Sequence, residues 1–169
     1  MTIFRPILAA AAAFALLAVP GTAQVVGGEL RNYDSSAPID FSADRIEVRE
    51  QQNEALFTGS VAVSQGTLDL TAASVRVLYS SAGTLSVNEL VADGGVTVRT
   101  PAESARAQRA IYDVRRSLVT LLGDVRLVRG GDTLSGDRLV IDLGSGRSSI
   151  AGTTQGGRVT GRFQPNSGG

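Results

Sequence analysis

The chain has 169 residues, and its 16 basic side chains balance its 16 acidic side chains, which gives a formal net charge of zero. It contains neither Cys nor His, which excludes disulfides, thiol or imidazole catalysis and the usual zinc sites. The balanced charge argues against binding of nucleic acid, which needs a strongly basic surface. We therefore expect no cofactor, no metal and no nucleic-acid partner.

The first 23 residues have the layout of a secretory signal peptide. Arg5 supplies a positive charge, residues 7–19 form an apolar run, and small residues precede a cleavage site after Ala23. The apolar run is shorter than the ~20 residues that a membrane-spanning helix needs. The sequence thus predicts an exported protein.

Two segments flank the expected domain. Residues 24–37 carry Gly, Asn and Ser with little periodicity, which indicates a flexible lead-in. Residues 153–169 form a glycine-rich tail, in which residues 158–163 alternate well enough to form one strand. The domain itself is expected over residues 38–152.

Apolar residues alternate with polar ones along most of this domain, which is typical of β-strands with one buried face. Phe57, Val61 and Val63 share one face, and later segments repeat the pattern. Residues 102–110 are the best helical candidate, because they contain good helix formers, although no apolar stripe of helical period is present.

The sequence also repeats itself. A shift of 64 residues superposes Gly59 on Gly123, Val61 on Val125 and many apolar positions between Ala43 and Ile141. A partial third copy begins at Gly94. Repeated short strands with one apolar face, and no helix to cover that face, predict an all-β twisted roll of stacked antiparallel strands folded over a hydrophobic interior. The medium-sized inward residues are compatible with either a closed core or an open groove.

A roll of this kind has edge strands at its ends. We expect residues 38–42 to form the first strand at one end, because Pro38 suits the start of an edge strand. The opposite edge is expected near residues 139–143 or, if it pairs, at residues 158–163. An exposed edge offers backbone groups to a second copy or to a related domain by strand addition.

Two blocks of sequence carry a family resemblance. The first runs from Ala37 to Asp44 and continues through Leu56-Phe57-Thr58-Gly59-Ser60-Val61 to Leu68, and the second begins at Ala110-Ile111-Tyr112-Asp113. Together they resemble the OstA-like domain of lipopolysaccharide export proteins, over about residues 38–150. The resemblance implies a β-jellyroll with a hydrophobic interior groove that shields the acyl chains of lipopolysaccharide in the periplasm. It also implies head-to-tail pairing with copies of itself, with an LptC-like inner-membrane partner and with an LptD-like outer-membrane partner.

The family's inward positions give a set of candidate lipid-binding residues in this chain. They are Ile39, Phe41, Val48, Phe57, Val61, Val63, Val96, Val98, Tyr112, Val114, Val125 and Leu127. The alternative is that they form an ordinary core, in a self-assembling structural β-repeat protein of the cell envelope that has no lipid ligand.

Catalysis is not expected. Asp113, Asp124, Asp132 and Asp137 are the acidic residues that a glycosidase-like site would need, but each has a turn or surface explanation.

The role of five arginines has two interpretations. They would suit contact with the phosphates of lipid A. Alternatively, they form a solvated face balanced by Glu103 and Asp113, and this is the interpretation that we favour. They are Arg99, Arg106, Arg109, Arg115 and Arg116.

Overall fold

Strands make up most of the described part of the chain. The computed structural model describes residues 24–26, 36–152 and 157–164, and within these ranges it contains no α-helix. In the described part, a 3₁₀ turn, η2, spans Glu50–Gln52. The strands are β1 (Gln24–Val26), β2 (Ile39–Ser42), β3 (Arg45–Arg49), β4 (Glu54–Gln65), β5 (Leu68–Ser80), β6 (Ser86–Arg99), β7 (Glu103–Asp113), β8 (Leu118–Arg129), β9 (Asp132–Asp142), β10 (Arg147–Ala151) and β11 (Thr160–Arg162).

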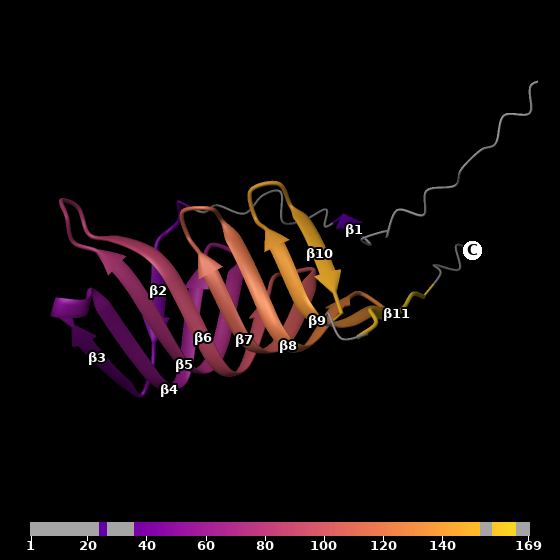
Figure 1. Cartoon of the computed structure of the whole chain (residues 1–169), viewed down its shortest axis with the longest axis horizontal. Helices are drawn as coiled ribbons and strands as arrows, with labels where there is room; N and C mark the ends of the chain where they lie inside the picture. Colours follow the sequence, from indigo (N-terminus) through magenta and orange to yellow (C-terminus); the bar gives the residue numbers. More distant parts are fainter. Residues whose placement is uncertain (1–23, 27–35, 153–156, 165–169) are drawn as a thin grey trace, which may run out of the picture.

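All the strands belong to one antiparallel sheet (Figure 1). The order is β1-β10-β9-β8-β7-β6-β5-β4-β2, with β3 also on β4 and β11 also on β9. Consecutive long strands are therefore neighbours joined by short turns. The prediction of an all-β roll of stacked antiparallel strands is confirmed.

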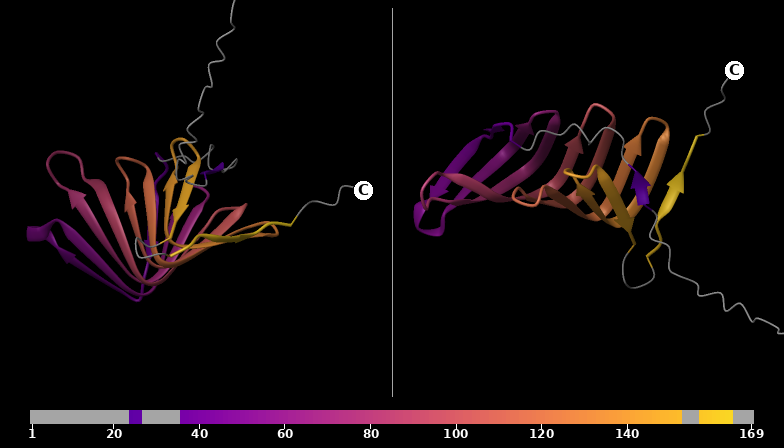
Figure 2. Two further views of the ribbon diagram at one scale, coloured as in Figure 1. Left: turned by 45° about the vertical axis from the view of Figure 1, so that its right-hand side comes forward. Right: turned by 90° about the horizontal axis from the view of Figure 1, so that it is seen from above.

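The six long strands, β4 to β9, each turn a corner part-way along their length. In Figure 1 they run down the near side, turn at the lower edge and continue behind, and Figure 2 shows the two directions from other sides. We call the two halves of the sheet wall 1 and wall 2. Wall 1 consists of residues 45–49, 54–58, 74–80, 86–93, 109–113, 118–122, 138–142 and 147–151, and wall 2 of residues 39–42, 61–65, 68–72, 96–99, 103–107, 125–129, 132–136 and 160–162.

The corners are made by pairs of residues with positive φ. They occur at Gly59–Ser60, Gly94–Gly95 and Gly123–Asp124, where the ladders of β4, β6 and β8 shift register. A Cβ atom at Gly94 would lie 2.6 Å from the Cβ of Ala73, so both the backbone angle and the space require glycine there. The repeated glycine motif of the sequence is thus the device that folds the sheet over.

The apolar faces of the two walls pack against each other and form the core. Leu121 and Val75 of wall 1 are fully buried, and Val61, Val96 and Val125 of wall 2 are 1% exposed. Burial of one such side chain contributes about 1.5–3 kcal/mol. With no helix in the described residues, the sheet buries its apolar face against itself.

Residues 102–110, the best helical candidate of the sequence, form no helix, because residues 103–110 lie within β7. Ala105, Ala107 and Ala110 are buried between β6 and β8, whereas Arg106 and Gln108 are exposed. The cross-strand partners on both sides override the intrinsic helix preference of alanine.

The two ends of the sheet are built alike. A shift of 64 residues maps β4 onto β8, and it maps β2 and β3 together onto β7, so the N-terminal edge is one strand divided at the corner. β2 is an edge strand, as expected. The prediction of an edge at residues 139–143 is wrong, because Ile141 in β9 pairs with Val119 of β8 and with Ser148 of β10. On wall 1 the C-terminal edge strand is β1, which pairs with β10. On wall 2 the edge strand is β11, which lies within the strand expected at residues 158–163.

The segments outside the domain are described only in part. Within the expected lead-in, Gln24–Val26 forms β1 and pairs with β10. Within the expected tail, Thr160–Arg162 forms β11. The predicted signal peptide, residues 1–23, lies outside the described residues. No helix of the described part is long and apolar enough to cross a membrane.

The corner geometry predicts that Gly94→Ala lowers the free energy of unfolding by about 1–3 kcal/mol, through the left-handed backbone and the contact with Ala73. Gly95→Ala is the matched control, because Gly95 has a similar φ of 76° but nothing within 4 Å of its added Cβ. Urea unfolding of the three proteins measures the difference. Equal losses in the two variants would show that the contact with Ala73 is unimportant.

Candidate functional site

The space between the walls is narrow and apolar. One cavity has a free volume of about 20 Å³ and is lined from both walls, by Ile39, Val63, Gln65, Leu68, Leu70, Leu90, Val98, Tyr112 and Val119. A neighbouring cavity of about 10 Å³ lies among Leu127, Ile141 and Leu143. Since a single water needs roughly 10–15 Å³, each cavity has room for about one water, and in this state the interior is closed to an acyl chain.

Eleven of the twelve predicted lipid-binding residues face this interior. Eight are at most 8% exposed: Phe57, Val61, Val63, Val96, Val98, Tyr112, Val125 and Leu127. Three are partly buried against the core: Ile39, Phe41 and Val114. The family's inward positions, together with alternation along the strands, correctly placed these residues on one face of the sheet.

Val48 is the exception, because it is 59% exposed. It pairs with Ala55, and its neighbour Ile46, which is 54% exposed, pairs with Phe57. Directly paired residues share a face of the sheet, so Val48 and Ile46 have the inward phase. They are exposed because β3 is the edge strand of wall 1, and no described part of wall 2 extends far enough to cover them.

The N-terminal end of the interior is marked by an aromatic pair. The rings of Phe41 on wall 2 and Phe57 on wall 1 stack with centroids 4.7 Å apart and an interplanar angle of 21°. Such a pair contributes roughly 0.5–1.5 kcal/mol beyond the area that it buries. It fixes the spacing of the walls close to this end.

Polar groups also lie in the interior. The hydroxyl of Tyr112 on wall 1 donates to Oε1 of Gln65 on wall 2 at 3.1 Å, and both side chains are buried. Glu103 is 8% exposed and forms an ion pair with Arg129 of the neighbouring strand β8. Paired in this way, these groups avoid the cost of burying an unsatisfied polar group.

Sequence reasoning missed part of this site. The aliphatic members Leu68, Leu70 and Leu90 were not selected, although the alternation of β5 continues through the first two. Gln65 was overlooked because it is polar. Its position two residues after Val63, in the inward phase of β4, was the signal that could have identified it.

The acidic residues considered for catalysis are not assembled into one site. Asp113 accepts from the backbone N–H of Arg116, Asp124 from Gln108, and Asp132 from the N–H of Gln164. Asp113 lies at the end of wall 1 and Asp132 at the start of β9 on wall 2. Among the described residues, no group of three or more acidic side chains could hold a metal ion.

The five arginines considered for phosphate contact are all exposed. Arg109 pairs with Asp93 at 2.6 Å and Arg116 with Asp113 at 3.7 Å, and the carboxylate of Asp93 raises the pKa of Arg109. Of the two acidic residues expected to balance this face, Asp113 pairs with Arg116, whereas Glu103 is buried and pairs with Arg129. Contact of the five arginines with a phosphate remains a prediction.

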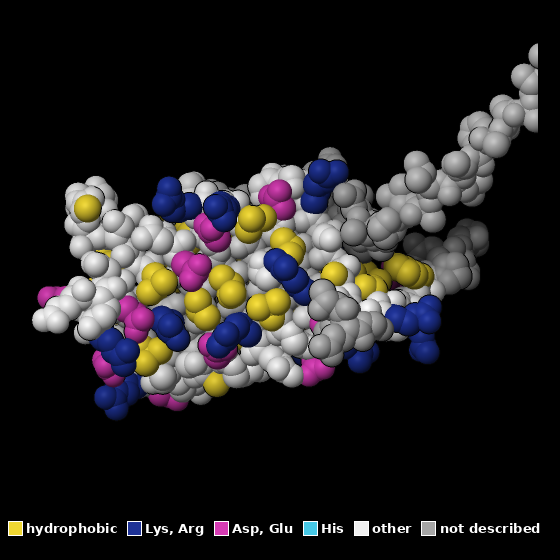
Figure 3. All heavy atoms as spheres, in the orientation of Figure 1, with side chains coloured by type: hydrophobic (Ala, Val, Ile, Leu, Met, Phe, Trp, Pro, Cys, Tyr) yellow, Lys and Arg dark blue, Asp and Glu magenta, His cyan; other side chains and the backbone are white. Residues whose placement is uncertain are grey.

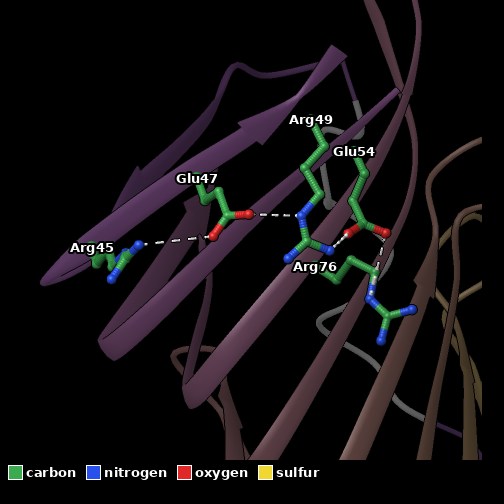
Figure 4. Close-up of polar contacts among 5 residues, drawn as sticks. All are labelled: Arg45, Glu47, Arg49, Glu54 and Arg76. Carbon is green, nitrogen blue, oxygen red and sulfur yellow. Dashed lines mark hydrogen bonds and ion pairs between the residues drawn. The ribbon is translucent and has the colours of Figure 1, made fainter. Parts of the chain in front are cut away.

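Charged side chains cover the outer face of wall 1 at its N-terminal edge (Figure 4). Arg49 joins Glu47 at 2.8 Å to Glu54 at 3.0 Å, and Arg76 approaches Glu54 at 3.8 Å. A hydrogen bond and the charge of Arg49 lower the pKa of Glu47. Exposed pairs of this kind add little stability, but they leave a charged outer surface beside the β3 edge.

Figure 3 shows the face of the molecule seen in Figure 1, with hydrophobic side chains between charged ones. One row of residues paired across neighbouring strands lies on the outer face of wall 1. Its hydrophobic members, all partly buried, are Leu56, Val91, Ile111 and Val140. Fully buried aliphatic residues are confined to the opposite, inward face of the same wall. The strongly apolar space therefore lies between the walls.

The comparisons with known proteins agree with this architecture. Residues 40–147 match the family described as LptA/(LptD N-terminal domain) LPS transport protein. The chain belongs to this family. The resemblance to OstA-like lipopolysaccharide export proteins is therefore confirmed, and the homologues are transport proteins.

Relatives cover most of the chain. Lipopolysaccharide export system protein LptH of Pseudomonas aeruginosa is 28% identical over 133 residues, which are 75% of each protein. An uncharacterized protein of Rhizobium meliloti is 26% identical over 162 residues, 92% of this chain and 84% of that protein.

The crystal structure of Pseudomonas aeruginosa LptH shares the fold. It is described as the LptA homologous periplasmic component of the conserved lipopolysaccharide transport device. It superposes with a TM-score of 0.70 at 21% identity and covers 79% of this chain and 99% of that chain.

The ion pairs of Figure 4 predict a titration result. The pKa of Glu47 should lie below its ordinary 4.5, and Arg49→Gln should return it toward 4.5. A lowered pKa in the folded state means that Glu47 favours folding above pH 4.5 and loses this contribution as the pH falls through its folded pKa. NMR titration of the Glu47 carboxyl carbon in both proteins tests this, and identical curves would contradict it.

Proposed function

We propose that this protein is a periplasmic bridge that binds lipopolysaccharide, shields the acyl chains of its lipid A and passes the lipid from the inner to the outer membrane. Membership of the lipopolysaccharide transport family supports the pathway. The observation that carries the proposal is the apolar space between the two walls, lined along β4 to β9 by buried aliphatic side chains.

An apolar space of this kind is needed because exposure of acyl chains to water costs much free energy. Each CH₂ group removed from water is worth roughly 0.8 kcal/mol, so a lipid with several acyl chains cannot cross an aqueous compartment alone. The interior offers many contacts of medium strength and few polar anchors. Such a surface shields the chains and still releases them to the next acceptor.

The proposed contacts are the eleven inward residues of the predicted set. Val48, together with Ile46, extends the same apolar face to the end of wall 1. An acyl chain that passes between this protein and a neighbouring jellyroll would contact Ile46 and Val48 where the two proteins meet.

Photo-crosslinking tests the lipid contact. Benzoylphenylalanine in place of Phe41, an inward residue of similar size, should form adducts with lipopolysaccharide in growing cells. The control is the same photo-reactive residue in place of Asp40, the exposed neighbour on the opposite face of β2. Adducts at both positions alike, or at neither, would contradict binding in the interior.

End-to-end assembly is the second part of the proposal. We expect copies to stack head to tail, and the terminal copies to pair with an LptC-like partner and an LptD-like partner. The divided edges support this, because β2 and β3 at one end and β1 and β11 at the other offer backbone groups to unlike partners. Exposed Ile46 and Val48 at one end and Phe163, 64% exposed, at the other add apolar surface.

Val48→Glu should reduce this self-association by tenfold or more without loss of monomer stability, because the residue is exposed in the single chain. Leu85→Glu is the matched control, since Leu85 is 68% exposed but lies in the turn between β5 and β6. Sedimentation velocity over a range of concentrations measures both. Unchanged association of Val48→Glu, or an equal loss with Leu85→Glu, would refute the end contact.

The closed interior favours a second candidate, a structural self-assembling envelope protein without a lipid ligand. A free volume of about 20 Å³ suits a sealed core. The two candidates differ in the crosslinking experiment, because a sealed scaffold assembles but gives no lipid adduct at position 41.

A further inference from the structure

The proposed ligand must enter a space that is closed in this structure. The walls meet along a seam, which we define as the line where the turns of wall 1 approach the turns of wall 2. These turns are residues 81–85, 114–117 and 143–146 on wall 1, and residues 66–67, 100–102 and 130–131 on wall 2. Both small cavities lie beside this line, since their linings reach Tyr112 and Leu143 on wall 1 and Gln65 and Glu103 on wall 2.

A hydrogen bond between Tyr112 and Gln65 crosses the seam directly. Tyr112 is the second-last residue of β7, and Gln65 is the last residue of β4. The tyrosine hydroxyl donates to Oε1 of Gln65 at 3.1 Å, and Nε2 of Gln65 donates to the carbonyl of Ala37 at 2.9 Å. Gln65 therefore ties the rim of wall 1 to the rim of wall 2 and to the residues that precede β2.

The chemistry of this contact suits a closure that opens. An aliphatic contact that parts exposes apolar surface to water. A hydroxyl and an amide that part are hydrated instead, which is why the net worth of such a bond is small. The pair is only 5% and 4% exposed, so it seals the interior while it is made and yields at modest cost.

We propose that acyl chains enter the interior sideways through this seam, and that the step which admits them is the breaking of the Tyr112–Gln65 hydrogen bond. The proposal rests on the proposed function and adds the route and the residues that control it. Entrance from the side leaves the polar headgroup in water, whereas passage end-on would draw that headgroup through an apolar space at high cost. It also lets a copy be loaded while both of its ends are occupied.

The opening can be measured without lipid. Because the sequence contains no Cys, spin labels can be placed at Thr67→Cys and Arg115→Cys, exposed turn positions on opposite rims. Tyr112→Phe should raise the population with a longer interlabel distance about two- to tenfold, which corresponds to the ~0.5–1.5 kcal/mol of one hydrogen bond. Tyr79→Phe, which removes a hydroxyl at the end of β5 on wall 1, should leave the distances unchanged. Unchanged distances in Tyr112→Phe, or equal changes in the two variants, overturn the proposal.

A double variant separates a specific bond from general loosening. Tyr112→Phe leaves Oε1 of Gln65 without this donor, and Gln65→Met leaves the hydroxyl without this acceptor. When both are replaced, neither member of the Tyr112–Gln65 bond remains, and apolar contact should close the seam at this place again. The carbonyl of Ala37 loses the Nε2 donor in Gln65→Met and in the double variant alike, so this loss does not affect the comparison of those two. We expect the double variant to be at least as closed as the unmodified protein. A double variant more open than either single variant overturns the proposal.

Lipid uptake distinguishes the route from the function. Purified lipopolysaccharide should associate about two- to tenfold faster with Tyr112→Phe than with the unmodified protein or Tyr79→Phe, and no faster with the double variant. An unchanged association rate despite wider distances overturns the side route. If the unmodified protein and every variant bind no lipopolysaccharide, the proposed function fails, and the spin-label distances still decide whether this bond closes the seam.

Discussion

A sheet with an apolar face must hide that face from water, and no helix in the described part of this chain is available to cover it. The corners are therefore the constraint on which the rest depends. Paired positive-φ residues at Gly59, Gly94 and Gly123 let alternate strands turn sharply, so one sheet becomes two opposed walls. Burial of the core, the narrow interior and the divided edges all follow from this folding over of the sheet.

The interior combines two kinds of contact with different responses to a guest. Aliphatic contacts between the walls can be replaced one for one by contacts with an apolar chain, so their loss is offset. The polar contacts at the rim, Tyr112 with Gln65 and Glu103 with Arg129, cannot be replaced in this way by hydrocarbon. The two walls are thus held together mainly by interactions that a lipid can substitute, and at the Tyr112–Gln65 contact by one that water can substitute, whereas the Glu103–Arg129 pair joins two neighbouring strands of wall 2.

Much of this architecture was predictable from the sequence, because strand phase is a local property. Phe57, Val61 and Val63 alternate, and their burial follows directly. The repeated glycine motif was recognised as a repeat, but its role at the corners depends on backbone angles that a repeat does not reveal.

The predictions that were wrong or incomplete share another cause. They depend on which distant residues cover or pair with a side chain, and strand phase gives only the face on which that side chain lies. Val48 has the inward phase and is exposed, since the opposite wall ends before it. The alanines of residues 102–110 favour a helix locally, but partners distant in sequence place them in β7. Hydropathy alone could not identify Gln65 as an interior residue, because its burial depends on a hydrogen bond from the hydroxyl of Tyr112 on another strand.

The spacing of the corners has a consequence for anything that moves along the interior. The corner motif recurs on every second strand, and neighbouring strands lie about 4.8 Å apart, so the lining repeats roughly every 10 Å. Val61, Val96 and Val125 occupy equivalent places and are equally buried. A hydrocarbon guest displaced by one period meets a valine again at these places, but two residues before each corner glycine it meets Phe57, Ala92 and Leu121 in turn. Its free energy along the axis therefore changes mainly with the size of these three side chains.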